Sequence, residues 1–458
     1  MIPELLSPAG TLRNLEYAFA YGADAVYAGQ PRYSLRVRNN DFTLDNLRTG
    51  INRAHELGKK LYVVSNIAPH NNKIATYLKD IEPVIEMNPD ALIMSDPGLI
   101  MMVKDKWPDQ TIHLSVQANV VNYATVEFWR RQGVSRIILS RELSLNEVAE
   151  IREKSPEMEL EVFVHGALCM AYSGRCLLSG YINHRDANQG SCTNACRWKY
   201  DAHEAKETAG GDYIPIGIDE NNFASAVQQF DPALGAGAPS EKVFLLQELN
   251  RPNEYMPTFE DQHGTYIMNS KDLRAIQHVE ALMKMGVHSL KIEGRTKSHY
   301  YTARTAQAYR QAIDDAAAGR PFDIRLMDVL ENMSSRGFTE GFFRRHVHDE
   351  YQNYERGTSI STKQQFVAEV AEDKGDYLIL DVKNRFELND SLELMTPDGN
   401  IGFKLTDIKD KKGQPRQDAP GSGFIVHIPK PTQAAGLDLS KAMIIRNLPE
   451  SLAVNISA

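Results

Sequence analysis

Residues 112–143, IHLSVQANVVNYATVEFWRRQGVSRIILSREL, contain the pattern that decides the fold. Two short apolar runs flank a segment of helical period, and each run ends in polar residues. These are Gln117 and Asn119 after the first run and Arg141 and Glu142 after the second. An apolar run, a helix and another apolar run with short connections predict two parallel strands joined by a crossover helix.

The same unit recurs along the chain. The candidate strands are residues 4–10, 25–30, 60–66, 91–96, 112–119, 136–143, 160–166 and 288–295. Eight strand–helix units with polar ends predict an α/β fold, a (β/α)8 TIM-like barrel with its active site at the carboxyl ends of the strands. A doubly wound sheet is the alternative, but no glycine-rich phosphate loop follows the first strand.

Strand alternation assigns an unusual number of polar side chains to the lumen of this barrel. The predicted lumen-facing residues include Ser115, Gln117, Asn119, Glu161, Phe163, His165, Lys291 and Glu293. Such a set is compatible with a reaction chamber and also with charged networks that are satisfied inside the core.

The rest of the chain departs from the strand–helix pattern. Residues 1–330 form the predicted barrel, interrupted at about 199–264 by an acidic insertion; between residues 201 and 261 there are twelve acidic and three basic residues. A linker is expected over 331–361. Period-two runs separated by Gly and Pro turns predict a small C-terminal β-barrel domain over 362–458.

Bulk properties indicate a globular protein. The chain has 458 residues, 42% of them hydrophobic, and a formal net charge of −9. No basic segment followed by an apolar run opens the sequence, and no stretch approaches the roughly 18 apolar residues of a membrane span. With four cysteines, too few for a disulfide scaffold, we expect a cytoplasmic protein with no membrane partner. These properties predict no particular oligomeric state.

All four cysteines lie within 28 residues, spaced C-x6-C-x15-C-x3-C as Cys169, Cys176, Cys192 and Cys196. Structural zinc usually uses pairs separated by two to four residues, and here only the last pair qualifies. An iron–sulfur cluster also takes four thiolates. Because a cluster is larger than a single ion it tolerates irregular spacing, so the spacing alone slightly favours an iron–sulfur cluster and leaves zinc as the alternative. The position directly after the seventh strand favours a reactive centre over a structural one.

Residues 161–179, EVFVHGALCMAYSGRCLLS, match a long family signature, Glu-x-Phe-x-x-Gly-Ala-Leu-Cys-x4-Gly-x-Cys-x-Leu-Ser. With SPAG at 7–10, MSDPGLIM at 94–101 and LKIEGRTKSHYYTARTAQAYRQAID at 290–314, the chain resembles the collagenase-like peptidase family. That family includes bacterial tRNA hydroxylation proteins and ubiquinone-synthesis proteins that carry a [4Fe–4S] cluster on four cysteines. The likeness covers nearly the whole chain and is weakest at about 200–235.

The resemblance implies a tRNA-modifying enzyme, a tRNA uridine 5-hydroxylase that converts the wobble uridine to 5-hydroxyuridine without oxygen and in dependence on prephenate. It also implies a [4Fe–4S] cluster on the four cysteines and the tRNA anticodon loop as partner. Prephenate is a dicarboxylate, for which arginines are the expected receptors. The candidates for binding it are Arg175, Arg141, Arg295 and Arg36, and the candidate catalytic residues are His165, Glu142 and Glu293.

Three stretches interleave basic and aromatic residues, as single-stranded RNA binding requires: 31–40, 291–310 and 336–357. Each is equally compatible with a solvated surface. Two other functions remain as alternatives, a zinc-stabilised RNA-binding protein and a collagenase-like peptidase. The peptidase has little support, because the sequence contains neither a His-Glu-x-x-His helix nor a Gly-x-Ser-x-Gly elbow.

Overall fold

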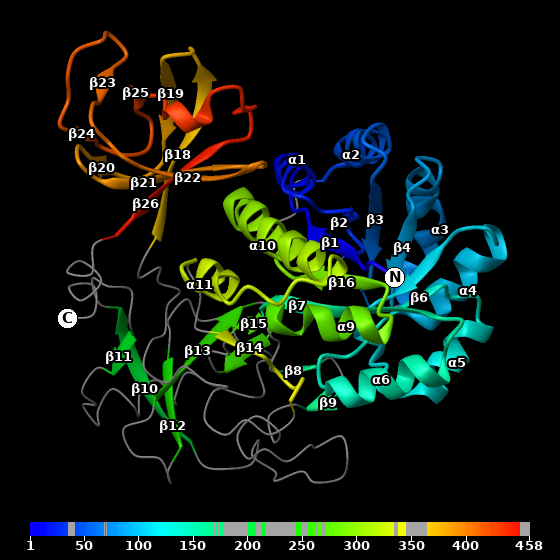
Figure 1. Cartoon of the computed structure of the whole chain (residues 1–458). Helices are drawn as coiled ribbons and strands as arrows, with labels where there is room; N and C mark the ends of the chain where they lie inside the picture. Colours follow the sequence, from blue (N-terminus) through cyan, green and yellow to red (C-terminus); the bar gives the residue numbers. More distant parts are fainter. Residues whose placement is uncertain are drawn as a thin grey trace.

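The computed structural model describes residues 1–34, 42–67, 69, 71–167, 272–333, 338–344 and 364–448, together with short strands between 171 and 267. Its first part is a closed barrel of eight parallel strands (Figure 1). Hydrogen bonding between β16 and both β1 and β7 closes the barrel. The strands are β1 (Glu4–Pro8), β2 (Ala25–Gly29), β3 (Lys60–Ser65), β4 (Ala91–Met94), β5 (Ile112–Leu114), β6 (Arg136–Ile138), β7 (Glu159–Ala167) and β16 (Ser289–Ile292).

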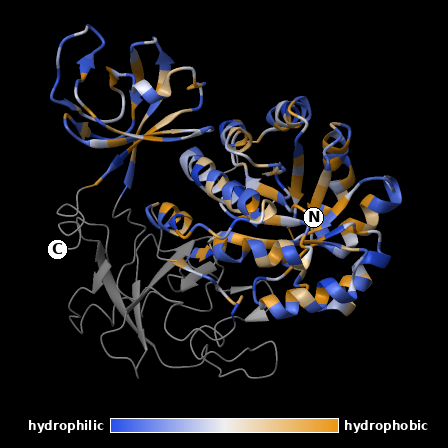
Figure 2. Ribbon diagram, in the orientation of Figure 1, coloured by the Kyte–Doolittle hydropathy of each residue, from blue (hydrophilic) through white to orange (hydrophobic). Residues whose placement is uncertain are grey.

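Helices surround this barrel and expose their hydrophilic sides (Figures 1 and 2). They are α1 (Leu12–Ala20), α2 (Leu44–Glu56), α3 (Asn71–Ile85), α4 (Pro97–Lys106), α5 (Tyr123–Arg131), α6 (Leu145–Lys154), α9 (Val279–Met285) and α10 (His299–Ala317). Side chains that end the preceding loops cap several of them, because a polar oxygen satisfies a free N–H of the first turn. Asp96 caps α4 and Asn122 caps α5 in this way, and Ser144 forms a capping box with Glu147 at α6.

The chain leaves the regular barrel order after β7. The hairpin of β8 (Ala171–Tyr172) and β9 (Arg175–Cys176) comes first. A five-stranded antiparallel sheet then lies within the predicted acidic insertion, in the order β11-β10-β12-β13-β14. Its strands are β10 (Tyr200–Glu207), β11 (Tyr213–Pro215), β12 (Phe244–Glu248), β13 (Tyr255–Asp261) and β14 (Gly264–Ile267).

Two short strands extend the barrel sheet next to the end of β7. β15 (Asp272–Arg274) pairs antiparallel with the last three residues of β7, and β17 (Phe338–Thr339) pairs with β15. The short helix α11 (Arg325–Glu331) precedes β17. The polypeptide therefore returns to the carboxyl end of β7 from two distant parts of the sequence.

The C-terminal domain is a seven-stranded antiparallel sheet in the order β22-β21-β26-β18-β19-β25-β23, plus a two-stranded ribbon of β20 and β24. Its strands are β18 (Gln364–Asp373), β19 (Tyr377–Val382), β20 (Phe386–Glu387), β21 (Ser391–Thr396), β22 (Gly399–Lys404), β23 (Lys409–Asp410), β24 (Asp418–Ala419), β25 (Ile425–Pro429) and β26 (Met443–Asn447). It has an apolar core of its own.

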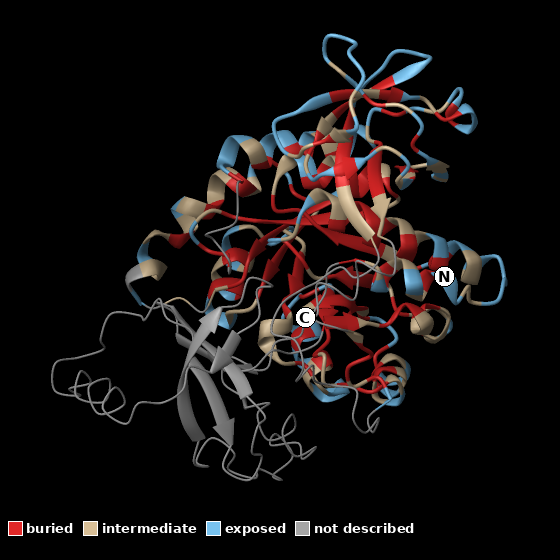
Figure 3. Ribbon diagram, turned by 90° about the vertical axis from the view of Figure 1, so that its left-hand side faces the viewer, coloured by how far each residue is buried: buried red, intermediate tan, exposed pale blue. Residues whose placement is uncertain are grey.

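This domain docks on α1 and α10 of the barrel through buried contacts (Figures 1 and 3). The Tyr21 hydroxyl donates to the carbonyl oxygens of Met395, at 3.2 Å, and Lys441, at 3.0 Å. Arg304, almost fully buried on α10, forms an ion pair with Glu393. Met395 belongs to the apolar core of the barrel, so that core continues into the C-terminal domain.

The structure confirms the predicted fold class, and all eight predicted strands are present. The predicted continuation of the fifth strand is wrong. β5 ends at Leu114, and residues 116–118 form a 3-10 turn that Ser115 caps, with Asn119 left-handed. Gln117 and Asn119 therefore do not alternate with Ser115 along a strand. None of the described helices is both long and apolar enough to cross a bilayer.

Candidate active site at the mouth of the barrel

The lower part of the barrel lumen contains a network of charged side chains. The Glu161 carboxylate, fully buried, accepts from Lys291 Nζ at 2.7 Å and from Arg136 at 3.3 Å. Arg136 also pairs with Glu4 at 2.6 Å and Glu159 at 2.8 Å. Every charge in this set has an opposite partner, as burial of ions requires. For Glu161 and Lys291 the structure therefore supports the interpretation as a satisfied core network.

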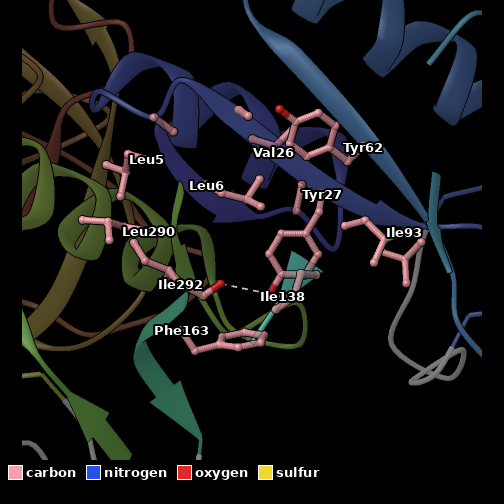
Figure 4. Packing of buried hydrophobic residues seen from close by; sticks show 14 of the residues in the cluster. Leu5, Leu6, Val26, Tyr27, Tyr62, Ile93, Ile138, Phe163, Leu290 and Ile292 are labelled. Carbon is pink, nitrogen blue, oxygen red and sulfur yellow. Dashed lines mark hydrogen bonds between the residues drawn. The ribbon is translucent and has the colours of Figure 1, made fainter. Parts of the chain in front are cut away.

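Above this network, aromatic rings line the lumen. Tyr27 and Phe163 lie close together inside the barrel (Figure 4), and the Tyr27 hydroxyl donates to the Ile292 carbonyl at 2.9 Å. Lys291 Nζ lies 4.3 Å from the centroid of the Tyr27 ring and 5.5 Å from that of Phe163. Burial lowers the pKa of Lys291, and the adjacent Glu161 only partly offsets this. An aromatic floor thus separates the lower charges from the mouth.

Two of the predicted arginines lie at this floor. The Arg141 guanidinium is 3.9 Å from the centroid of the Phe163 ring, and the Arg295 guanidinium is 6.0 Å from that of Tyr27. Arg141 Nε is buried and has no hydrogen-bond partner among the residues that the structure describes. Arginines over aromatic faces create a positive potential suited to a carboxylate or phosphate with a planar or cyclic body.

The predicted orientation of His165 is wrong. A register shift in the pairing of β7 with β16 adds one residue between Phe163 and His165. The His165 ring packs against Tyr301 and Tyr309 of α10, with centroids 5.9 and 5.5 Å away, and not in the lumen. Its Nδ1 lies 3.4 Å from the Tyr309 hydroxyl.

Burial and the positive charges of Arg274 and Lys297 lower the pKa of His165 to about 3. The imidazole is therefore neutral at pH 7, which excludes it as a cationic acid while leaving it able to hydrogen-bond. Its Nε2 is buried and has no hydrogen-bond partner within the described part of the chain.

The two predicted carboxylates occupy different positions at the mouth. Glu142 is half-buried and accepts a hydrogen bond from the Ser140 hydroxyl. Glu293 follows β16, where its backbone N–H donates to the His165 carbonyl at 2.8 Å. Its own carbonyl accepts from the Tyr301 hydroxyl at 2.7 Å. Glu142 is thus adjacent to Arg141 in sequence, whereas the backbone of Glu293 ties the end of β16 to β7 and α10.

Gly166 is required at this junction. Its φ is +99°, and a Cβ at this position would lie 2.5 Å from the Glu293 carbonyl oxygen. Only glycine adopts this conformation without strain and allows such an approach. The chain thereby passes from β7 toward the cysteine-bearing segment directly beside the end of β16.

The remaining predicted site residues cannot be placed as side chains. Cys169, Cys192, Cys196 and Arg36 lie outside the described residues, and Arg175 and Cys176 are described only as the backbone of β9, where Tyr172 and Ala171 are their partners. Among the described residues no group of three or more His, Cys, Asp or Glu side chains could hold a metal ion.

Sequence reasoning missed Tyr27 as part of the site. The signal was present, because strand alternation in AVYAG puts Tyr27 on the same face as Ala25 and Gly29. A closed barrel of eight parallel strands surrounded by helices defines a TIM-barrel protein.

The chain belongs to peptidase family U32: it matches "Peptidase family U32" over residues 10–353 and "Peptidase family U32 C-terminal domain" over residues 362–446. It is 64% identical to tRNA hydroxylation protein P of Escherichia coli, covering 97% of both chains. It is 61% identical to the protein of that name from Haemophilus influenzae, covering 97% of this chain and 96% of the relative. A protein called collagenase from Porphyromonas gingivalis is 28% identical, over 74% of this chain and 73% of that one.

Proposed function

We propose that this protein is a tRNA uridine 5-hydroxylase that acts on the wobble uridine without oxygen, with prephenate as co-substrate and a [4Fe–4S] cluster. The observation that carries the proposal is the 64% identity, over 97% of both chains, to a relative named for tRNA hydroxylation. The cationic and aromatic mouth of the barrel supports the same function. Action on tRNA would place the protein in the cytoplasm.

The small co-substrate suits the barrel mouth. Prephenate carries two carboxylates on a ring, and Arg141 and Arg295 are cations next to aromatic faces. In this proposal the arginines hold the carboxylates, and Tyr27 and Phe163 contact the ring. Lys291 stays below the floor, paired with Glu161, and does not touch the ligand in this proposal.

The cluster would be held by Cys169, Cys176, Cys192 and Cys196. Four thiolates are the donor set that a [4Fe–4S] cluster requires, and the chain has no other cysteine. When bound, such a cluster supplies electron transfer and an iron atom that can coordinate a substrate oxygen. Of the candidate proton carriers, Glu142 follows Arg141 in the sequence and is half-buried, whereas the neutral His165, four residues before the first cysteine, would serve as a hydrogen-bonding group.

Nucleoside mass spectrometry of tRNA tests the function. Deletion of the gene should remove 5-hydroxyuridine and its derivatives, and expression of the wild-type protein in the same strain should restore them. Unchanged nucleosides in a strain without a second copy of the gene would refute the proposal.

A second measurement tests the cofactor independently of activity. Protein purified without oxygen should be brown and contain iron and acid-labile sulfide, and each of four single Cys→Ala variants should lose the absorbance. Colourless protein containing zinc would favour an RNA-binding protein without redox chemistry. Gelatin cleavage abolished by only one of the four Cys→Ala changes would favour a peptidase.

A further inference from the structure

A basic hairpin lies at the edge of the C-terminal domain. Residues 409–416 begin with β23, which lies on the side of the domain away from the barrel (Figure 1). The Asp410 carboxylate accepts from the backbone N–H groups of Lys412, at 2.8 Å, and Gln414, at 2.9 Å. The Asp410 side chain therefore stabilises the turn by accepting hydrogen bonds from its backbone. Lys411 and Lys412 are exposed at its tip.

An exposed aromatic ring lies next to this hairpin. Arg416 returns opposite Ile408, since its N–H donates to the Ile408 carbonyl at 2.8 Å, and its guanidinium lies 5.9 Å from the centroid of Phe424. Phe424 is 45% exposed, so part of its ring is open to solvent.

A further arginine joins the group. Arg416 and Arg385 approach the same carboxylate, Asp418, at 3.5 and 3.3 Å. We call the set of Arg385, Lys411, Lys412, Arg416 and Phe424 the hairpin patch. It contains four cations and one exposed ring: Arg416 lies next to the ring, both arginines pair with Asp418, and Arg385 also pairs with Glu387 at 3.1 Å.

Packing in the protein buries part of a competing candidate for RNA contact. The sequence singled out residues 291–310 for their basic and aromatic side chains. On α10, however, Tyr301 and Tyr309 are buried against β7, and Arg304 is buried against the C-terminal domain. These side chains are used inside the protein and cannot meet phosphates or bases.

We propose that the hairpin patch binds tRNA, with Lys411, Lys412 and the two arginines against backbone phosphates and Phe424 stacked on an unpaired base. The inference rests on the proposed function, which makes tRNA the substrate. Cations flanking an exposed aromatic ring are what sequence-tolerant binding of single-stranded nucleotides requires. The patch lies away from the barrel, so it holds nucleotides other than the one that is modified.

The test uses the full-length protein and unmodified tRNA in filter-binding titrations across a salt series. The double variant Lys411→Gln/Lys412→Gln should bind several-fold more weakly at low salt. Its slope of log affinity against log salt should fall by about 1.4 to 1.8, because each lost phosphate contact lowers the slope by about 0.7 to 0.9.

The ring is tested separately. Phe424→Ala should weaken binding by about five-fold or more, with the salt slope unchanged, because stacking on a base does not release counterions. The matched control is Arg131→Gln/Lys284→Gln, which removes two cations that are 72% and 70% exposed on α5 and α9 of the barrel. Its affinity and salt slope should stay at wild-type values. Unchanged melting temperatures would confirm that the variants fold.

Wild-type affinity and slope in both patch variants would overturn the inference, as would an equal loss in the control or no tRNA binding by the wild-type protein. Hydroxylation is measured separately by mass spectrometry of the tRNA. If the wild-type protein hydroxylates tRNA but the patch variants bind tRNA normally, the proposed role of the hairpin patch is refuted and the proposed function is not. Binding through the patch with no hydroxylation by the wild type refutes the function and leaves the patch standing.

Discussion

The ion pair of Glu161 and Lys291 in the barrel lumen yields the sharpest prediction. Glu161→Gln keeps the shape of the side chain and removes its charge. Arg136 would retain Glu4 and Glu159. Lys291, whose side chain is 3% exposed, would lose the carboxylate that Nζ contacts at 2.7 Å. The variant therefore isolates one buried cation.

The expected loss of stability follows from two estimates that agree. Removing one partner of a buried ion pair costs about 3–5 kcal/mol. Alternatively, Lys291 becomes neutral in the folded variant, and deprotonating a lysine of ordinary pKa at pH 7 costs about 4.6 kcal/mol. Because deprotonation of Lys291 is always available to the folded variant, the loss of stability cannot exceed about 5 kcal/mol.

The free energy of unfolding of Glu161→Gln should increase with pH. Burial already lowers the pKa of Lys291, and the variant lowers it further. Between that lowered value and the ordinary one of about 10.4, the unfolded chain binds a proton that the folded chain does not, so stability rises with pH. Raising the pH from 7 to 9 should therefore restore up to about 2.7 kcal/mol to Glu161→Gln.

Urea unfolding followed by tryptophan fluorescence measures these effects in the barrel, because all three tryptophans precede residue 199 and the C-terminal domain contains none. The control is Glu161→Gln/Lys291→Met, which removes both charges and should be much more stable than Glu161→Gln alone. A loss below about 1 kcal/mol at pH 7, or one that does not shrink at pH 9, would refute the assignment of this pair as a buried structural contact.

Three other predictions follow from the same structure. Arg141→Met should raise the KM for an anionic co-substrate roughly 10- to 100-fold with an unchanged melting temperature, because a charge-assisted hydrogen bond is lost; an unchanged KM in steady-state assays would contradict this. Gly166→Ala should lower the melting temperature clearly, since its Cβ would approach the Glu293 carbonyl to 2.5 Å; differential scanning fluorimetry showing wild-type stability would count against it. Glu369 on β18 pairs with Arg13 on α1 and His299 on α10, and so joins the C-terminal domain to the barrel. Burial alone would raise the pKa of Glu369, but hydrogen bonds from His299 and Arg13 lower it to about 2, so its stabilisation of this docking should be lost as the pH falls from 4.5 to about 2. Limited proteolysis should detect undocking of the C-terminal domain over this pH range in the wild type. Glu369→Gln should show no such change with pH.

The barrel itself could be read from the sequence. Each strand and its following helix are set by local periodicity, and eight repeats of one unit leave few ways to close a parallel sheet. Arg141 and Arg295, two of the predicted ligand-binding residues, lie over aromatic rings at the end of the barrel that the polar strand ends indicated. The roles assigned to the cysteines, Arg36 and Arg175 remain predictions.

What the sequence could not determine depends on contacts between distant residues. Alternation predicted an inward-facing His165, but the paired register of β7 with β16 shifts by one residue just before it, and such a shift turns a side chain to the opposite face. Likewise, Glu161 meets Lys291 across 130 residues only because β7 and β16 become neighbours when the barrel closes. On α10, Tyr301 and Tyr309 pack against the barrel and Arg304 against the C-terminal domain, contacts that the sequence pattern of these residues did not predict.

The amino-acid sequence by itself thus determined the barrel, the polar carboxyl ends of its strands and the clustering of the thiols, because all three follow from local order along the chain. Only the tertiary structure decided which charged side chains form ion pairs with each other and which remain available to a ligand. That distinction depends on the partner each side chain acquires when strands far apart in sequence come together, and no local pattern contains it.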